Sequence, residues 1–477
     1  MNEIAYVDIW QTCTQLLFHQ TEAVAKLLPA RVGALFMEMG TGKSRVAIEL
    51  AKIRQEKIDR VIWACPVSLR DTVRYEIAKH TGNDCQTYVF DDKTNETNVR
   101  LNAFWYIVGL ESISGSARVV CTFAQLVTER SFVIVDESSY IKGHRAKRTE
   151  RLILLCEKAR YRLILTGTPI SQGIQDLYAQ MKFLSPKILG YKSWYSFARN
   201  HLEYSEKFKG MIVRTHNLEF IAAKIKPYVY QVTKAECLTL PKKLYHSRIL
   251  HLTDEQAEAY AEAKEIYLTE ALMADEFDSI SIFRLFTALQ AIVCGFWTKP
   301  DGEKVQLAHN RLDRLADVLQ AIANTEKVVI WAKYHHCIRQ IGERLKADYG
   351  SESVCQFHGL NINTRQAELA RWRDSGRFLI ITQSAGGHGM TLNESHHAVF
   401  YANGFKYAER LQAEDRNHRI GQHFPVTYID LHCIDTIDDR IAKALASKGN
   451  AVEQFRREVD KVKKSHKDKL KALVRSL

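Results

Sequence analysis

A glycine-rich turn joins an apolar run to a helix-forming segment early in the chain. The run Ala34–Phe36 leads into the turn Met37–Ser44, which ends Gly40-Thr41-Gly42-Lys43-Ser44, and residues 45–52 follow with a helix-like pattern. Glycines let backbone N–H groups close around an anion, and a helix N-terminus adds partial positive charge. The order strand, turn and helix therefore predicts a phosphate-binding loop in an α/β domain. The alternative is a glycine turn that caps an ordinary helix.

Two acidic residues favour the phosphate-binding interpretation. Asp136-Glu137 follows the apolar run 132–135, which places the pair at the carboxyl end of a predicted strand. Ligands of doubly wound sheets bind at such ends. Beside a phosphate loop, Asp136 would hold Mg²⁺ and Glu137 would orient and deprotonate water. In the helix predicted over 12–28, the Gln20 amide has the paired donor and acceptor that match an adenine edge.

Apolar runs alternate with helix-like segments along most of the chain. This alternation predicts parallel sheets covered by helices on both faces. The predicted strands are 61–66, 105–108, 119–122, 132–135, 163–165, 328–331, 354–357, 378–381, 399–401 and 426–431, the last closing the second sheet. Two helices, 254–275 and 280–297, separate the sheets. The predicted domains are a first lobe over 1–225, an inter-lobe segment over 226–305 (which the family resemblance described below interprets as a helical protrusion), a second lobe over 306–446 and a basic C-terminal helix over 447–477.

Composition limits the class of protein. No run of eighteen apolar residues exists and the N-terminus lacks a secretory pattern, so we expect neither a membrane span nor secretion. Ten cysteines without a CxxC pair argue against a zinc module and for reduced thiols in a cytoplasmic compartment. A net charge of +12 suits a polyanionic partner.

The second half has no phosphate loop of its own. We therefore expect a cleft between two lobes, with the second lobe supplying groups to the nucleotide. Arg416 and Arg419, three residues apart in a predicted helix, would share one face and could stabilise charge on a transferred phosphoryl group. The alternative for this pair is a surface ion-pair array. The basic segment 453–475 is either a solvated terminal helix or a contact for phosphate backbones.

In this order the motifs resemble helicase superfamily 2, and within it the SWI/SNF-type family of DNA-translocating ATPases. The resemblance extends from about residue 12 to 446. It is carried by the strings Glu38–Ser44, Cys65–Leu69, Thr122–Phe123, Leu165–Ile170, Phe357–Gly359, Ser384–Gly389 and Gln412–Gln422. The superfamily does not require glycine at position 37, so Met37 fits the pattern.

The resemblance implies two RecA-like lobes, each a doubly wound and mostly parallel sheet, with ATP and Mg²⁺ between them and duplex DNA across both. Implied catalytic residues are Lys43, Asp136, Glu137, Arg416 and Arg419, with Arg419 as the arginine finger. Implied nucleotide contacts are Gln20, Gly40, Thr41, Gly42, Lys43, Ser44 and Gly389. Implied Mg²⁺ ligands are Ser44 and Asp136. Implied DNA contacts are Pro66, Ser68, Thr122, Gly359, Ser384 and Gly386. Implied coupling residues are Thr166, Gly167, Thr168 and Gln412.

Three features depart from the family pattern. Ser138-Ser139 stands where the family usually has Ala-His, which leaves open how the ATP site is coupled to Thr166. The segment 226–236 lacks the usual paired arginines, and Phe405–Tyr407 replaces a Trp-Asn-Pro step. With no added chromatin-reading domain in the sequence, these departures lead us to expect a minimal bacterial or phage member in the cytoplasm.

Three functions remain open at this point. The first is a DNA-stimulated ATPase that translocates along duplex DNA as a monomer. The second is a helicase that separates strands or migrates branches, which would use branched or single-stranded DNA. The third is a nucleotide-gated DNA-binding scaffold with little turnover, against which the complete set Lys43, Glu137 and Arg419 argues.

Overall fold

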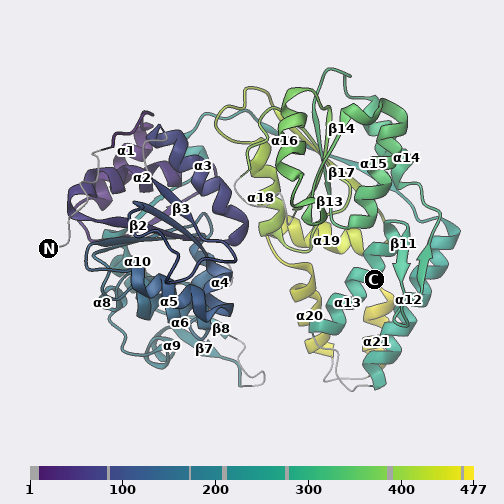
Figure 1. Ribbon diagram of the computed structural model, residues 1–477. Coiled ribbons are helices and arrows are strands. Elements are labelled where there is room, and N and C mark those ends of the chain that lie inside the picture. The colour runs from purple at the N-terminus through teal and green to yellow at the C-terminus, as the bar shows by residue number, and fades with distance from the viewer. Residues whose placement is uncertain are drawn as a thin grey trace. The chain divides into compact units, whose positions relative to one another are not determined.

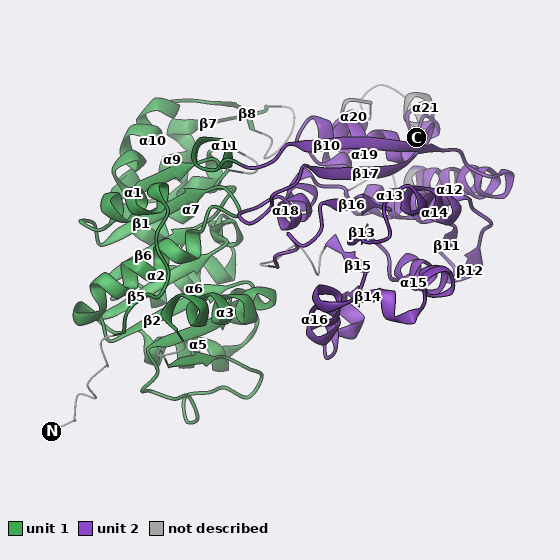
Figure 2. Cartoon of the chain, turned by 90° about the horizontal axis from the view of Figure 1, so that it is seen from above, with its two compact units in different colours: residues 1–239 green, residues 240–477 purple. Residues whose placement is uncertain are grey.

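The computed structural model describes residues 10–82, 86–170, 173–206, 212–273, 279–383, 390–462 and 467–477. The chain divides into two compact units, Met1–Thr239 and Leu240–Leu477 (Figure 2). Each unit has its own sheet and its own buried apolar clusters. Within the described residues, no helix is both long and apolar enough to span a membrane.

The first unit is built on a seven-stranded sheet in the order β3-β4-β2-β5-β6-β1-β9 (Figure 1). Its strands are β1 Val32–Met37, β2 Arg60–Cys65, β3 Thr87–Val89, β4 Trp105–Gly109, β5 Ser131–Asp136, β6 Tyr161–Leu165 and β9 Val229–Val232. Every neighbouring pair is parallel. The central strands are buried almost throughout, because helices cover both faces.

The helices of the first unit divide between the two faces of this sheet. One face is covered by α1 Phe18–Leu27, α2 Lys43–Arg54 and α3 Arg70–Thr81. On the other face lie α4 Leu110–Gly115, α5 Ala117–Leu126, α6 Lys147–Leu155, α7 Gln175–Leu184, α8 Pro186–Leu189, α9 Trp194–His201 and α10 Leu218–Ile225. A hairpin of β7 Leu202–Tyr204 and β8 Ile212–Thr215 and the short α11 Lys234–Cys237 complete the unit. This is the predicted doubly wound arrangement.

One predicted strand is wrong. Residues 119–122 lie in the helix α5, whose N-cap Ser116 accepts a hydrogen bond from the Val119 N–H at 3.4 Å. Val119, Thr122, Phe123 and Leu126 are its buried residues, and their spacing is the helical period of three to four. The run of β-branched residues suggested a strand, but the buried residues are spaced with the period of an α-helix, and the segment is helical.

The second unit is built on a six-stranded sheet in the order β10-β17-β16-β13-β15-β14, again with all neighbours parallel. Its strands are β10 Lys243–Leu250, β13 Val328–Ala332, β14 Val354–Phe357, β15 Phe378–Thr382, β16 His397–Phe400 and β17 Val426–Cys433, with a hairpin of β11 Phe296–Thr298 and β12 Lys304–Gln306. Its helices are α12 Asp254–Met273, α13 Ser279–Val293, α14 Arg311–Gln320, α15 His335–Tyr349, α16 Arg365–Asp374, α18 Tyr407–Asn417, α19 Ile437–Ala446, α20 Ala451–Val462 and α21 Lys467–Arg475.

The predicted domain limits differ from the observed division. Residues 226–305 were expected to form one inter-lobe segment, but β9 extends the first sheet and β10 extends the second. Because β10 pairs with β17 along its whole length, β17 does not close the second sheet. Nor do residues 447–477 form a separate helix. They contain α20 and α21, which pack against α13 and α12, and Phe455 and Val474 are buried in the same apolar cluster as these helices (Figure 1).

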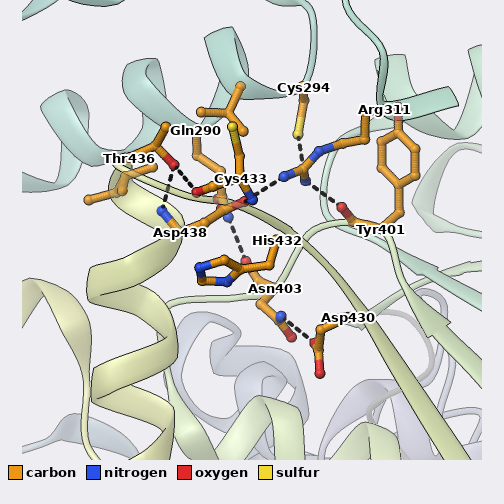
Figure 3. Close-up of polar contacts among 12 residues, drawn as sticks. Gln290, Cys294, Arg311, Tyr401, Asn403, Asp430, His432, Cys433, Thr436 and Asp438 are labelled. Carbon is orange, nitrogen blue, oxygen red and sulfur yellow. Dashed lines mark hydrogen bonds and ion pairs between the residues drawn. The ribbon is translucent and has the colours of Figure 1, made fainter. Parts of the chain in front are cut away.

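A buried arginine ties several elements of the second unit together (Figure 3). Arg311, the first residue of α14, is only 1% exposed. Its guanidinium pairs with Asp438 at the start of α19 and donates to the Tyr401 carbonyl after β16. It also lies 3.8 Å from Cys294 Sγ at the end of α13. The pair is therefore a fixed point for four segments that are distant in sequence.

Replacing Arg311 with alanine should destabilise the second unit by ~3–5 kcal/mol, because the buried Asp438 carboxylate loses its counter-charge. The measurement is urea unfolding of the full chain. Arg314→Ala is the matched control, since Arg314 is exposed on the same helix and should cost no more than ~0.5 kcal/mol. Equal effects of the two substitutions would contradict this role for Arg311.

Candidate functional site

Three neighbouring strands of the first sheet deliver the predicted site residues to one edge. The strands β5, β6 and β1 are adjacent and parallel, so their carboxyl ends lie side by side. The loop Glu38–Gly42 follows β1, the pair Asp136-Glu137 ends β5, and Thr166–Thr168 follows β6. The predicted phosphate loop, acidic pair and coupling motif are therefore brought together within the first unit.

The backbone of the loop requires its glycines. Gly40 and Gly42 have φ values of 80° and 88°, a region that other residues rarely adopt. A Cβ on Gly42 would also lie 2.1 Å from Gln20 Nε2. Helix α1 holds the loop from this side, because Gln20 Nε2 donates to the Thr41 carbonyl at 3.0 Å and His19 Nε2 bonds to the same oxygen at 2.8 Å. Gln20 thus contacts the loop, while its contact with adenine stays a prediction.

Lys43 curls back over the loop that it terminates. Its Nζ donates to the Met37 carbonyl at 3.0 Å and to the Glu38 carbonyl at 3.4 Å, while the Thr41 hydroxyl donates to the Glu38 carbonyl at 2.8 Å. Ser44 is half-buried in the first turn of α2. The ammonium and hydroxyl are therefore placed at the helix N-terminus, where the backbone dipoles favour an anion.

The carboxylate of Asp136 is held by two donors. Trp63 Nε1 on the neighbouring β2 donates to Oδ2 at 3.3 Å, and the Glu137 N–H donates to Oδ1 at 2.9 Å. Burial raises the pKa of Asp136 to about 6; the nearby Lys43 opposes this shift and Glu137 adds to it. Sequence reasoning missed Trp63, which the sheet order alone brings next to β5.

The Glu137 side chain is oriented by two hydroxyls. Ser139 Oγ donates to Glu137 Oε1 at 2.7 Å, and Thr166 Oγ1 donates to the same oxygen at 3.3 Å. The Thr168 N–H in turn donates to Thr166 Oγ1 at 3.1 Å. Glu137 has a φ of 49°, an uncommon conformation for a non-glycine residue and a frequent one at functional sites. Ser139 and Thr166 therefore meet at one oxygen, a direct link between the acidic pair and the β6 loop that uses no histidine.

Gly167 lets two loops approach closely. A Cβ there would lie 3.2 Å from both the backbone nitrogen and the Cγ of Met39 in the phosphate loop. On the opposite side of β1, the Glu38 N–H donates to the Val232 carbonyl at 3.0 Å and Glu38 Oε2 accepts from the Lys234 N–H at 2.7 Å. The phosphate loop is thus confined between the segments that follow β6 and β9.

In the second unit, Arg416 and Arg419 do not share a helix face as predicted. Helix α18 ends at Asn417, so Arg419 lies beyond it. Nη1 of each arginine nevertheless donates to the Met390 carbonyl at 3.3 Å. Arg416 is buried and Arg419 half-buried, which excludes an exposed surface ion-pair array. Gln412 lies half-buried on α18.

A buried network of charges fixes α18 on its sheet. Arg410 pairs with Glu414 at 2.8 Å and with Asp430 on β17, and both Lys243 and Tyr245 of β10 donate to Glu414 Oε2, at 2.9 and 2.8 Å. Figure 3 shows the continuation of this network: Asn403 Nδ2 donates to Asp430 at 2.8 Å and Gln290 Nε2 of α13 donates to the Asn403 carbonyl at 2.9 Å. Sequence reasoning missed these residues, although an aspartate within an apolar strand such as β17 is a usable signal.

The predicted DNA contacts lie in different settings. Pro66 and Ser68 follow β2, and Gly359 follows β14, all near carboxyl ends of strands. Thr122 does not: it is fully buried in α5 and its hydroxyl donates to the Arg118 carbonyl at 2.8 Å. A strand end near β2 is supplied instead by β4, and Glu111, in the first turn of the helix α4 that follows it, accepts a hydrogen bond from the Val67 N–H at 2.9 Å. Ser384, Gly386 and Gly389 lie outside the described residues.

These features define a two-lobed α/β protein with a phosphate-binding loop and an acidic pair on neighbouring strands. The SNF2-related domain family matches residues 19–296, and the helicase conserved C-terminal domain matches residues 310–421. The chain therefore belongs to the SNF2-related family. The predicted resemblance and the predicted fold class are confirmed.

Individual relatives are distant. The chain is 24% identical over 449 residues to "ATP-dependent DNA helicase DDM1" of Arabidopsis thaliana, a match that covers 87% of this chain and 58% of that protein. It is 25% identical over 464 residues to "DNA annealing helicase and endonuclease ZRANB3" of Mus musculus, covering 90% of this chain and 40% of that protein. The Sulfolobus solfataricus SWI2/SNF2 ATPase core, solved in complex with dsDNA, shares 20% identity over 93% of each chain with a TM-score of 0.43. The chain thus spans 58% and 40% of the lengths of these two curated relatives, less than two thirds of either.

Replacing Asp136 with asparagine should stabilise the nucleotide-free protein at pH 8 more than at pH 5. The folded-state pKa of Asp136, about 6, lies above its ordinary value of 3.8, so its stabilising contribution is complete below pH 4 and lost as the pH rises through 6. A neutral asparagine avoids this loss, worth ~1 kcal/mol, or ~2–4 °C in Tm. Thermal unfolding at both pH values measures the difference.

The matched control is Asp92→Asn, which changes an exposed aspartate of the same unit. Its Tm should follow the native protein at both pH values. If Asp136→Asn also follows the native protein, the pKa of Asp136 is not raised and this account of the carboxylate is wrong.

Proposed function

We propose that this protein hydrolyses ATP and couples the hydrolysis to translocation along duplex DNA. The observation that carries the proposal is the meeting of Lys43, Asp136 and Glu137 at one sheet edge in a chain of the SNF2-related family. The names of its relatives, an ATP-dependent DNA helicase and a DNA annealing helicase, support it. So does the "putative ATP-dependent helicase/translocase YwqA" of Bacillus subtilis, 24% identical over 341 residues that cover 68% of this chain and 35% of that protein.

The phosphate loop would bind the nucleotide through backbone and side chain together. The amides of Gly40–Ser44 and the Lys43 ammonium suit the β- and γ-phosphates. The oxygen donors Ser44 and Asp136 fit Mg²⁺, which prefers hard oxygen ligands, and a cation would favour the ionised form of the half-buried Asp136 carboxylate. When bound, Mg²⁺ supplies charge neutralisation at the phosphates. Gln20 would hold the loop and face the base.

Glu137 would orient the attacking water. Its Oε1 accepts from Ser139 and Thr166, which fixes the direction of the carboxylate before any substrate arrives. The same contacts make Thr166, Gly167 and Thr168 a route by which the β6 loop responds to the state of Glu137. In the second unit, Arg416 and Arg419 would stabilise charge on the transferred phosphoryl group, with Arg419 as the finger and Gln412 as a coupling residue.

Duplex DNA is the proposed track. Ser68, Gly359 and the start of α4 lie near carboxyl ends of strands, where ligands of such sheets bind. A net charge of +12 favours a polyanion, and phosphate contacts would make binding weaken steeply with salt. Contacts to backbone rather than bases suit a protein that moves along DNA of any sequence.

The rate of ATP hydrolysis should rise strongly with duplex DNA and less with single-stranded DNA or RNA. The measurement is steady-state ATPase with each nucleic acid at equal nucleotide concentration. Displacement of a third strand from a triplex, without unwinding of a forked duplex, distinguishes translocation from strand separation. An ATPase rate that duplex DNA leaves unchanged is incompatible with the proposal.

Glu137→Gln should keep ATP binding and reduce turnover at least ~100-fold, because glutamine retains the shape but cannot take a proton from water. Binding of a fluorescent ATP analogue and the DNA-stimulated ATPase rate are the two readouts. Glu157→Gln, an exposed change in the same unit, should alter neither. Near-normal turnover in Glu137→Gln would remove Glu137 from this role.

A further inference from the structure

Three side chains of types that bind metals lie close together at the amino-terminal ends of strands in the second sheet. Glu326 precedes β13, and His396-His397 stands at the start of β16, the neighbouring parallel strand. One ligand atom from each residue lies within 4.8 Å of the other two. Within the described part of the chain, no second group of this kind occurs. The cluster is formed by the amino-terminal ends of strands, so the proposed ATPase does not use it.

The geometry is close to that of a transition-metal site. Tetrahedral zinc with bonds of ~2.0–2.1 Å holds its ligand atoms ~3.4 Å apart. His396 Nε2 and Glu326 Oε2, 3.2 Å apart, already have this spacing. The ring centroids of His396 and His397 are 4.4 Å apart, so small rotations about side-chain bonds would complete the set. Because Val328 and His397 are paired in register, the sheet fixes His397 beside the segment that carries Glu326, two residues before Val328.

His397 has a nitrogen that the rest of the structure leaves unused. Its Nδ1 is buried and makes no hydrogen bond to any described residue. Buried polar atoms without a partner are uncommon in native proteins, and a bound ion often satisfies them.

A pocket of about 250 Å³ lies against two of the three ligands. Glu326 and His396 line it together with Glu394, His423 and Phe424. Glu394 is already paired with Arg373 at 3.0 Å, which leaves the His423 imidazole as the candidate for a further ligand from the pocket. Two histidines and one carboxylate with an open side are a donor set that zinc accepts, the fourth position going to water or another ligand.

We propose that Glu326, His396 and His397 bind a zinc ion whose fourth coordination position opens into this pocket. The ion joins the loop before β13 to the start of β16 and stabilises the second unit. Its effect on stability follows from binding to the folded state alone, since the three ligands come together only in the folded sheet. The proposal is independent of the ATPase function.

The test is a titration of the full chain, freed of metal by a chelator, with Zn²⁺ in competition with a chromophoric chelator. We expect a single tight equivalent and a rise in Tm on binding. His396→Ala and Glu326→Gln each remove a ligand and should each weaken the Zn²⁺ affinity at least ~10–100-fold. Losses of that size follow even from removing a group that only hydrogen-bonds to a ligand. The matched control is His432→Ala. His432 pairs with Asp439 at 2.6 Å, but no third metal-binding side chain joins this pair among the described residues.

Cobalt substitution separates this site from cysteine coordination. Cys13 and Cys121 are exposed thiols that could also take up zinc. Co²⁺ at the proposed site should give the ligand-field bands of a four-coordinate centre without thiolate charge-transfer bands, and His397→Ala should abolish them. If the Zn²⁺ affinity of His396→Ala and Glu326→Gln equals that of the native chain, or if thiolate bands dominate, the cluster is an ordinary ion pair and the proposal is wrong.

Discussion

The parallel register of β5, β6 and β1 is the constraint on which the first unit's site depends. Asp136 is paired with Leu165, and Leu165 with Leu35, so the three strands end in one row. In strands buried on both faces, a slip of one residue would exchange the side chains that pack against the two helix layers, and these close-packed layers would no longer fit. Because the core fixes this row, the phosphate loop, the acidic pair and the Thr166 loop need no long-range contacts of their own to meet. Their polar contacts then adjust directions within a geometry that hydrophobic burial has already set.

The second unit positions its arginines by different means. Helix α18 is attached to β17 and β10 through buried ionic contacts centred on Arg410 and Glu414. Buried ion pairs often contribute little net stability, because desolvation offsets the attraction between the charges. These ion pairs instead restrict the orientation of α18, because few rotations of the helix allow Arg410 to pair with Glu414 and Asp430 at the same time. We infer that this network defines where the segment carrying Arg416 and Arg419 begins.

The sequence predicted elements that have a strong local signal. It did not predict elements whose type depends on the spacing of buried residues or on contacts with distant residues. The runs that became β1, β5, β13 and β15 are apolar without interruption, so their burial could be predicted. Residues 119–122 also looked apolar, but their spacing belongs to α5. Strand β10 is almost wholly exposed and offers no apolar run, so nothing in its composition indicated a strand.

Contacts between residues that are distant in sequence could not be predicted either, because they depend on which strands and helices become neighbours. The bond from Trp63 to Asp136 and the pair of Arg410 with Asp430 exist only because the sheets place these strands or helices side by side. Similarly, the motif pattern placed Arg419 in a helix, whereas the chain leaves the helical conformation at His418. Motifs thus predicted the residues of the first site, and the structure supplied the residues that orient them.

The short path of the chain between the two units gives one further consequence. Lys234 is bonded through its N–H to Glu38 of the phosphate loop, and the Pro241 carbonyl accepts from His418 beside Arg419. Only residues 235–240 separate Lys234 and Pro241, the two anchors, along the chain. A segment of this length spans at most ~25 Å when fully extended. Insertions or deletions at 239–240, after α11, would change the reach of one anchor from the other while leaving the hydrogen bonds of α11 intact. Length variation at this position is thus a means by which evolution, or an engineer, could retune such a protein without altering its chemistry.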